Sequence, residues 1–228
     1  AQESRGLGDV YKRQEYVAGL RLGVVTDTQD TSGTVLETNP VCVTRAQLEA
    51  ALRQFLGPIE QIPPMYSAIK INGQKLYELA RRGQEVARRP RSITIHALEL
   101  LEGEGADWTV RVRCSKGTYV RTLCHDIGGS MGVPAHMSFL LRTRSGAFEL
   151  DGSFTIDELK ELKEKGELYK AVIPMEQALM HIGEARMTLN KKGERFLTHG
   201  AEVVCPGIEE LPKDTPLRAY SVSYTHLR

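Results

Sequence analysis

The chain has 228 residues, of which 41% are hydrophobic and 26% charged, and its formal net charge is +1. This composition is ordinary for a globular protein, and the length allows one large domain with a small appendage. No apolar run is long enough to span a bilayer, which argues against a membrane-spanning helix.

The cysteines predict a reduced, cytoplasmic protein. They are Cys42, Cys114, Cys124 and Cys205, and no two of them form a C-x-x-C pair or follow a secretory signal. Cys114 and the pair Cys124-His125 could be combined with His136 into a metal site, but this spacing matches no usual zinc pattern. We therefore expect no metal site at these residues.

The first elements predict a hairpin. Residues 15–23 alternate apolar and polar positions, as a strand does, and residues 34–37 form the returning strand. The connection 26–33 is rich in short polar side chains that bond their own backbone. Its Asp27 and Asp30 invite a calcium interpretation, but the other ligands of a calcium loop are absent, so a hairpin loop is favoured.

A helix is predicted over 44–57, with Thr44 as N-cap, Gln47 completing a capping box and Gly57 as the stop. The following residues 58–73 read as an extended loop stiffened by Pro63 and Pro64. This loop would present Tyr66 and Lys70 as a contact surface. The alternative is a loop tucked onto the core through its apolar groups.

Residues 70–91 form a basic segment with seven Lys or Arg and two Glu. Such a local excess of positive charge fits a surface that meets phosphates, although a solvated helix face is the plain alternative. A second helix is predicted over 74–83 within it.

The rest of the chain predicts an α+β fold. Strands are expected over 91–103 and 107–121, paired around a tight turn, followed by a helix after Tyr119 and an apolar run over 135–150. A capped helix covers 155–168 through Thr155 and Glu158. From residue 182 to 220 the sequence looks like the opening of a small β-rich module.

Three motifs, in this order, carry a resemblance: "PPMYSAIKINGQKLYELARRGQEV" (63–86), "CSKGTYVRTL" (114–123) and "LRTRSGAF" (141–148). Together they resemble the TruB-type tRNA pseudouridine synthases, over about 15–217. The resemblance implies a mixed, largely antiparallel sheet flanked by helices over 15–181, and a partial PUA-like domain over 182–220. It implies isomerisation of uridine 55 in the T arm of tRNA, without metal or cofactor, in a monomeric parent protein.

The resemblance also implies roles for individual residues. Family members flip the target uridine out of the RNA, and an aspartate then attacks the nucleoside. Tyr16 resembles the tyrosine that packs on the flipped base and assists removal of the C5 proton, and Arg121 resembles the arginine that pairs with the aspartate. A guanidinium can hold a carboxylate by two parallel hydrogen bonds and keep it ionised.

The remaining expected substrate-binding residues are Tyr66, Lys70, Lys116, Tyr119, Leu140, Arg142 and Arg144. Tyr119 and Leu140 resemble pocket walls, and the others lie in motifs near the RNA. The alternatives from pattern alone are a core tyrosine at 119 and, for Arg121, a surface ion pair with Asp126 or a nearby Glu.

The family's aspartate lies in a His-Thr-Gly-Ala-Leu-Asp segment upstream of the first strand, and the chain does not contain that segment. Residues 1–14 and 221–228 resemble translated adapter sequence, so we expect both to be non-native and the chain to be an interior piece. We therefore expect the chain as given to be inactive, with an exposed sheet edge that favours self-association.

Two other functions stay open. A relative could bind the T arm without chemistry, using the basic segment, and its binding would then be sensitive to salt. The chain could also be an α+β interaction domain whose basic face is merely solvated.

Overall fold

The structure is a computed structural model that describes residues 13–71, 73–174, 188–199 and 208–210. The chain divides into two compact units, 1–156 and 157–228, which are treated separately below. Within the described residues no helix is both long and apolar enough to cross a membrane.

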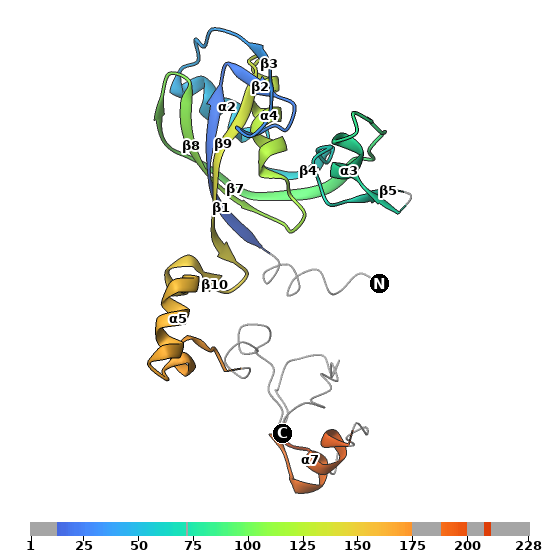
Figure 1. Cartoon of the computed structure of the whole chain (residues 1–228), viewed down its shortest axis with the longest axis vertical. Helices are drawn as coiled ribbons and strands as arrows, with labels where there is room; N and C mark the ends of the chain where they lie inside the picture. Colours follow the sequence, from blue (N-terminus) through green and yellow to red (C-terminus); the bar gives the residue numbers. More distant parts are fainter. Residues whose placement is uncertain (1–12, 72, 175–187, 200–207, 211–228) are drawn as a thin grey trace. The chain divides into compact units, whose positions relative to one another are not determined.

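The first unit is organised by a six-stranded sheet, and its fold confirms the predicted α+β class (Figure 1). Every neighbouring pair of strands in it is antiparallel. In spatial order the strands are β10 (Phe148–Glu149), β9 (Ala135–Ser145), β1 (Gln14–Leu22), β8 (Asp107–Cys114), β7 (Arg91–Glu104) and β4 (Gly57–Gln61).

Strand β8 shows why one face of this sheet is buried. Its alternate residues Trp108, Val110, Val112 and Cys114 are buried, whereas the residues between them are at least partly exposed. Side chains on a strand point to opposite faces in turn, so this period places all four apolar side chains on one face. The central strand β1 is buried on the same face through Ala18, Leu20 and Leu22.

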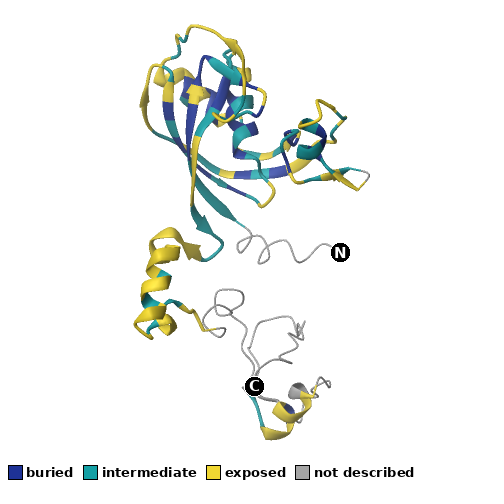
Figure 2. Ribbon diagram, viewed as in Figure 1, coloured by how far each residue is buried: buried dark blue, intermediate teal, exposed yellow. Residues whose placement is uncertain are grey.

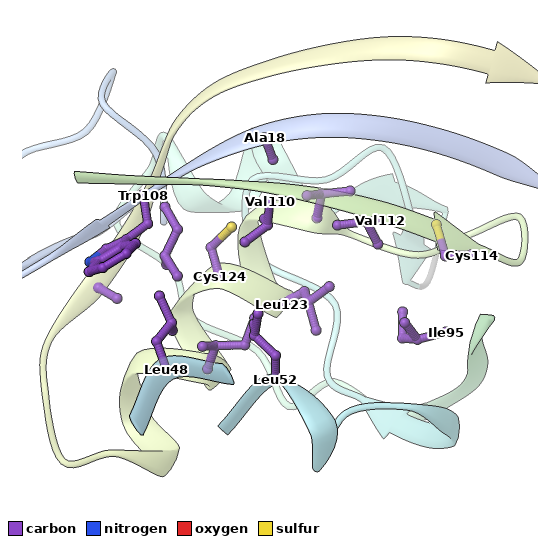
Figure 3. Packing of buried hydrophobic residues seen from close by; sticks show 14 of the residues in the cluster. Ala18, Leu48, Leu52, Ile95, Trp108, Val110, Val112, Cys114, Leu123 and Cys124 are labelled. Carbon is purple, nitrogen blue, oxygen red and sulfur yellow. The ribbon is translucent and has the colours of Figure 1, made fainter. Parts of the chain in front are cut away.

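Helices α2 (Arg45–Arg53) and α4 (Val120–Ser130) cover that face (Figures 2 and 3). Leu48 and Leu52 of α2 and Leu123 and Ile127 of α4 belong to the same buried cluster as the strands. The predicted capping box of α2 is confirmed, because Thr44 and Gln47 exchange the expected hydrogen bonds.

The end of α2 differs from the prediction. The helix stops at Arg53, and Gly57, with φ of +90°, opens strand β4 instead of closing the helix. Residues 57–61, expected to belong to a loop, pair with β7. Pro58 is tolerated there because β4 is the last strand of the sheet and needs no further ladder partner.

Smaller elements extend from the sheet. The predicted first hairpin is wrong in its first strand. The strand expected over 15–23 is β1, which pairs with β8 and β9, and the returning strand β3 (Val35–Thr38) pairs antiparallel with β2 (Val24–Thr26) instead. The basic segment holds the hairpin of β5 (Lys70–Ile71) and β6 (Gln74–Lys75), then the short helix α3 (Leu76–Ala80). Figure 1 shows α3 and β5 beyond β4, away from α2.

The second unit is described in part. The helix predicted from Thr155 onward is present as α5 (Ile156–Glu164), followed by a 3-10 turn (Leu168–Ala171). Further on, β11 (Thr188–Leu189) pairs antiparallel with β12 (Ile208–Glu210), and α7 (Lys191–Thr198) lies between them in sequence. Most of the expected PUA-like domain and nearly all of the two adapter-like ends lie outside the described residues.

Candidate functional site

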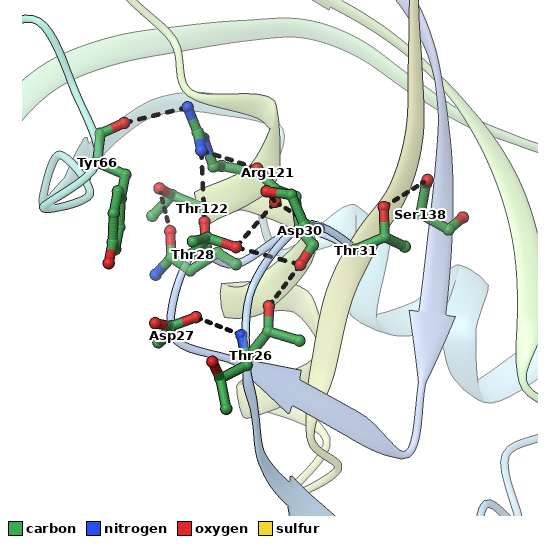
Figure 4. A network of polar contacts seen from close by, with 12 residues as sticks. Thr26, Asp27, Thr28, Asp30, Thr31, Tyr66, Arg121, Thr122 and Ser138 are labelled. Carbon is green, nitrogen blue, oxygen red and sulfur yellow. Dashed lines mark hydrogen bonds and ion pairs between the residues drawn. The ribbon is translucent and has the colours of Figure 1, made fainter. Parts of the chain in front are cut away.

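The N-terminus of helix α4 carries a polar network centred on Arg121 (Figure 4). Its Nη1 lies 2.8 Å from Asp30 Oδ2 and 3.5 Å from the Thr28 carbonyl oxygen. Its Nη2 donates to the Tyr66 carbonyl oxygen at 3.2 Å. The guanidinium is thus held by the β2–β3 loop on one side and by the Pro-rich loop on the other.

Asp30 is the partner of Arg121, so the expected alternative pairing with Asp126 or a nearby Glu is wrong. Burial alone would raise the pKa of Asp30, but hydrogen bonds from Ser32 and Thr28 and the charge of Arg121 outweigh it and lower that pKa. The carboxylate is therefore ionised at neutral pH and compensates the half-buried guanidinium. In contrast, burial raises the pKa of Asp126, which the neighbouring His125 opposes.

Gln61 joins this network from the end of β4, and the sequence analysis missed it. The side chain is 2% exposed. Its Oε1 accepts from the Tyr119 N–H at 2.8 Å, and its Nε2 donates to the Tyr119 carbonyl oxygen at 3.1 Å. A glutamine directly before a Pro-rich loop gives no local signal of a partner 58 residues away.

The structure brings Tyr16 and Arg142 together across strands β1 and β9. The two residues are register partners, and the Arg142 guanidinium carbon lies 5.7 Å from the centre of the Tyr16 ring. Burial raises the pKa of Tyr16, while the charge of Arg142 opposes that shift. Leu140 is the register partner of Ala18 on the same pair of strands. Ala18 is buried whereas Leu140 is 45% exposed, so the apolar side chains on this face of the sheet extend from the core to the solvent-exposed surface.

The other expected substrate-binding residues are spread around the sheet. Lys116 is exposed on the turn before α4, and Lys70 is exposed on the β5–β6 hairpin. Arg144 pairs with Glu149 at 3.2 Å and donates to the Gly146 carbonyl oxygen. Among the described residues, the hydrogen bonds of Arg121 go to Thr28, Asp30 and Tyr66 and to none of these three.

The basic segment is largely open to solvent. Most of its cations are exposed, namely Lys70, Arg81, Arg82, Arg89 and Arg91. Tyr77 lies between two further charges, with Lys75 Nζ 5.3 Å and the Arg81 guanidinium carbon 5.5 Å from its ring centre. Arg88 is the exception, because it turns inward and donates to the Pro63 carbonyl oxygen at 3.2 Å.

The residues considered for a metal site serve other roles. Burial raises the pKa of the Cys114 thiol to about 11 and that of Cys124 to about 12, so both stay protonated in the core. His136 Nδ1 bonds the Val24 carbonyl oxygen at 2.8 Å. In the described part of the chain no three His, Cys, Asp or Glu side chains gather as metal ligands do.

Comparison with known proteins shows which family this chain resembles. Residues 8–120 match the model of the "TruB family pseudouridylate synthase (N terminal domain)", and residues 121–180 match that of the "tRNA pseudouridylate synthase B C-terminal domain". A tRNA pseudouridine synthase B of Stutzerimonas stutzeri is 45% identical over 213 residues, which cover 92% of this chain and 68% of that protein. The same enzyme of Bacillus pumilus is 47% identical over 178 residues, covering 75% of this chain and 58% of that protein.

Among solved structures, a chain of a Cbf5-Nop10-Gar1 complex is similar with a TM-score of 0.64 and 32% identity, covering 89% of this chain and 53% of that one. A chain of an H/ACA RNP bound to a substrate RNA gives a TM-score of 0.62 at 29% identity, covering 87% of this chain and 51% of that one. The sheet with α4 against it is thus the fold of a pseudouridine synthase. The chain belongs to the TruB family of pseudouridylate synthases.

Proposed function

We propose that the protein to which this chain belongs isomerises uridine 55 in the T arm of tRNA to pseudouridine. Its relatives carry the name tRNA pseudouridine synthase B, and this chain spans 58% of the Bacillus pumilus relative. The observation that carries the proposal is the placement of Arg121, whose guanidinium is held at the start of α4 by acceptors from two separate loops.

The reaction breaks the N1–C1′ bond of the uridine, turns the base and joins C5 to C1′, releasing the C5 proton. An aspartate must attack the nucleoside in its ionised form. Within the described residues at most three of the five Arg121 N–H donors are used, so at least two are left to hold that carboxylate. Arg121 would then bridge two carboxylates, Asp30 and the nucleophile.

The flipped base would meet the surface beside this network. Tyr16 offers an aromatic face, and stacking on a base is worth about 1–3 kcal/mol. Leu140 and Tyr119 would wall the pocket, while Tyr66, Lys70, Lys116, Arg142 and Arg144 would contact the RNA. Burial keeps the Tyr16 phenol protonated at neutral pH, since its pKa is raised.

We expect the 228-residue chain itself to give no turnover, because it does not contain the His-Thr-Gly-Ala-Leu-Asp segment. The test is tritium release from a tRNA labelled at C5 of its uridines. The complete protein, with that segment upstream of β1, should release one tritium per tRNA, and its Arg121→Lys variant should lose most of the rate since the planar fork is gone. Turnover by the chain alone would contradict the assignment of the nucleophile.

A second candidate is an RNA-binding relative without chemistry, which the exposed cations of the basic segment favour. It predicts tight, salt-sensitive T-arm binding by a complete protein that releases no tritium. The source DNA upstream of codon 15 separates the two, because only the enzyme needs an aspartate there. Either function would be exercised in the cytoplasm, where tRNA is processed, by a monomeric parent protein.

A further inference from the structure

We propose that Gln61 is a positioning residue, whose side-chain amide fixes the backbone of Tyr119 so that Tyr119 and Arg121 face the flipped base in one geometry. The proposal rests on the proposed function for its purpose, and on the contacts below for its mechanism. Among the described residues of the first unit, Gln61 links the edge strand β4 to the start of α4 through two hydrogen bonds.

The side-chain amide of Gln61 hydrogen-bonds both the N–H and the carbonyl of Tyr119, as the backbone of a neighbouring strand would. It accepts from the N–H at 2.8 Å and donates to the carbonyl at 3.1 Å. Tyr119 is the N-cap of α4, in extended conformation, and its side chain makes no capping hydrogen bond. The Tyr119 N–H depends on this side chain, which is 2% exposed, whereas the carbonyl oxygen also accepts from the Leu123 N–H at 3.0 Å within α4. Leaving such buried groups unpaired is costly, so the pairing restrains the backbone strongly.

The contacts close a ring. Gln61 holds Tyr119, Arg121 follows two residues later, and its Nη2 donates to the carbonyl of Tyr66, which lies five residues after Gln61. Pro63 and Pro64 stiffen the chain between Gln61 and Tyr66. The sides of the ring are therefore two short stretches of chain, the two hydrogen bonds of Gln61 to Tyr119 and the single hydrogen bond of Arg121 to Tyr66. A shift at Gln61 would reach the guanidinium without passing through the core.

Arg88 ties the ring to the basic segment. Its Nη1 donates to the Pro63 carbonyl oxygen at 3.2 Å, and its Nη2 pairs with Glu85 at 3.0 Å. The side chain is 21% exposed, so this contact is sheltered from solvent. The surface expected to grip phosphates is thereby attached to the loop that carries Tyr66. The loop that carries Pro63 and Tyr66 would therefore support both the phosphate-binding surface and the position of Arg121.

The direct test is hydrogen exchange in the chain itself, measured as the protection factor of each amide. Gln61→Met keeps the length of the side chain and removes both hydrogen bonds, so protection at Tyr119 should fall about tenfold while that of Val112, in the sheet, stays within about twofold. The proposal would be overturned if the Tyr119 amide were as protected in the variant as in the parent. It would also be overturned if the Tyr119 and Val112 amides lost protection equally, because an equal loss indicates global destabilisation.

The Gln61→Glu variant should regain protection at Tyr119 when its carboxylate is protonated, which a side chain that merely fills space would not do. An ionised carboxylate accepts from the Tyr119 N–H but faces its carbonyl oxygen without a proton to donate. Protonation restores the donor, so protection at Tyr119 should return toward the parent value as the pH falls. Gln54→Glu, at an exposed position after α2, is the matched control and should show no such dependence. A pH-independent Gln61→Glu variant counts against the proposal.

A further experiment measures base flipping in RNA. It uses a T-arm stem-loop that carries 2-aminopurine beside the target uridine, and the fluorescence of 2-aminopurine rises when the neighbouring base leaves the stack. The parent chain should bind and give the rise. Gln61→Met should bind within about threefold of the parent, because phosphate contacts dominate affinity, and lose most of the rise. An unchanged rise overturns the proposal. If the parent does not bind at all, the proposed function fails, and hydrogen exchange still decides the role of Gln61.

Discussion

Arg121 and Asp30 form a half-buried ion pair across 91 positions of sequence, with 2.8 Å between Nη1 and Oδ2 and side-chain exposures of 26% and 18%. The pair joins the first turn of α4 to the β2–β3 loop. Asp30 also accepts from the Thr28 hydroxyl and the Ser32 backbone N–H. The aspartate thus organises its own loop and holds the guanidinium at once.

The pair predicts a pH-dependent loss of stability. The pKa of Asp30 is lowered in the folded state, so its stabilisation is present above the ordinary Asp pKa and is lost as the pH falls through the folded value. Asp30→Asn should lower the free energy of unfolding by about 1–3 kcal/mol at pH 7. The difference from the parent should begin to shrink below about pH 4, where the unfolded chain takes up a proton at this carboxyl, and shrink further as the pH falls through the lower folded value.

Urea unfolding at pH 7 and at pH 3 measures this difference. Asp151→Asn makes the same chemical change at an exposed position and should be nearly neutral at both. A deficit for Asp30→Asn that stays equal at the two values would mean that the carboxylate charge is not what stabilises the loop.

The exposed cations of the basic segment predict salt-sensitive RNA binding. Replacing Arg81, Arg82 and Arg89 by Gln should weaken binding to a T-arm stem-loop. Each lost phosphate contact should reduce the slope of log K against log[salt] by about 0.7–0.9. Fluorescence anisotropy over a salt series gives the slope. Arg53→Gln, exposed at the end of α2, is the control, and an equal effect there would point to general charge rather than this surface.

Local patterns in the sequence predicted most of the elements. The alternation of β8 and the capping box of Thr44 and Gln47 each depend on residues within a few positions of one another. The end of α2 was misplaced because a glycine serves equally as a helix stop and as the left-handed entry to a strand. Gly57 opens a strand because β4 pairs with β7, and that pairing joins segments far apart in the sequence.

The contacts of the site could be predicted only in part. Family motifs pointed to Arg121 and Tyr16, and the structure gives each a close partner, Asp30 and Arg142. The sequence drew attention to Asp30 only as a possible calcium ligand and to Gln61 not at all, because each meets its partner through the folding of distant segments. Short-range sequence patterns carry no record of such pairings, so these two residues emerged from the coordinates.

The core predicts a large cost for a single truncation in α4. Leu123 is fully buried between α4, α2 and the sheet (Figure 3). Leu123→Ala should lower the free energy of unfolding by about 2–5 kcal/mol, because the transfer term and the cavity add. Leu36→Ala, at a side chain that is 66% exposed, should change it by less than about 0.5 kcal/mol. Urea midpoints compare the two, and similar shifts would contradict the assigned core.

Strand β9 predicts that the chain associates with itself. Arg144 and Ser145 pair with β10, and the loop between β2 and β3 bonds Met137 and Ser138, so among the described residues the outer edge has no strand partner over 139–143. Phe139 and Leu141 are each nearly half exposed on the same strand. An unpaired edge with apolar side chains is a template for another strand. We therefore expect sedimentation velocity to show species larger than one chain, increasing with protein concentration.

The same strand supplies the test. Replacing Phe139 and Leu141 together by Ser removes apolar area from one face of β9 and should shift the chain toward the monomer at every concentration. Leu36→Ser, at a more exposed apolar side chain on the β2–β3 hairpin, should leave the distribution unchanged. A parent chain that sediments as a monomer throughout would show that the open edge of β9 is already protected. Equal effects of the two variants would place the contact elsewhere on the molecule.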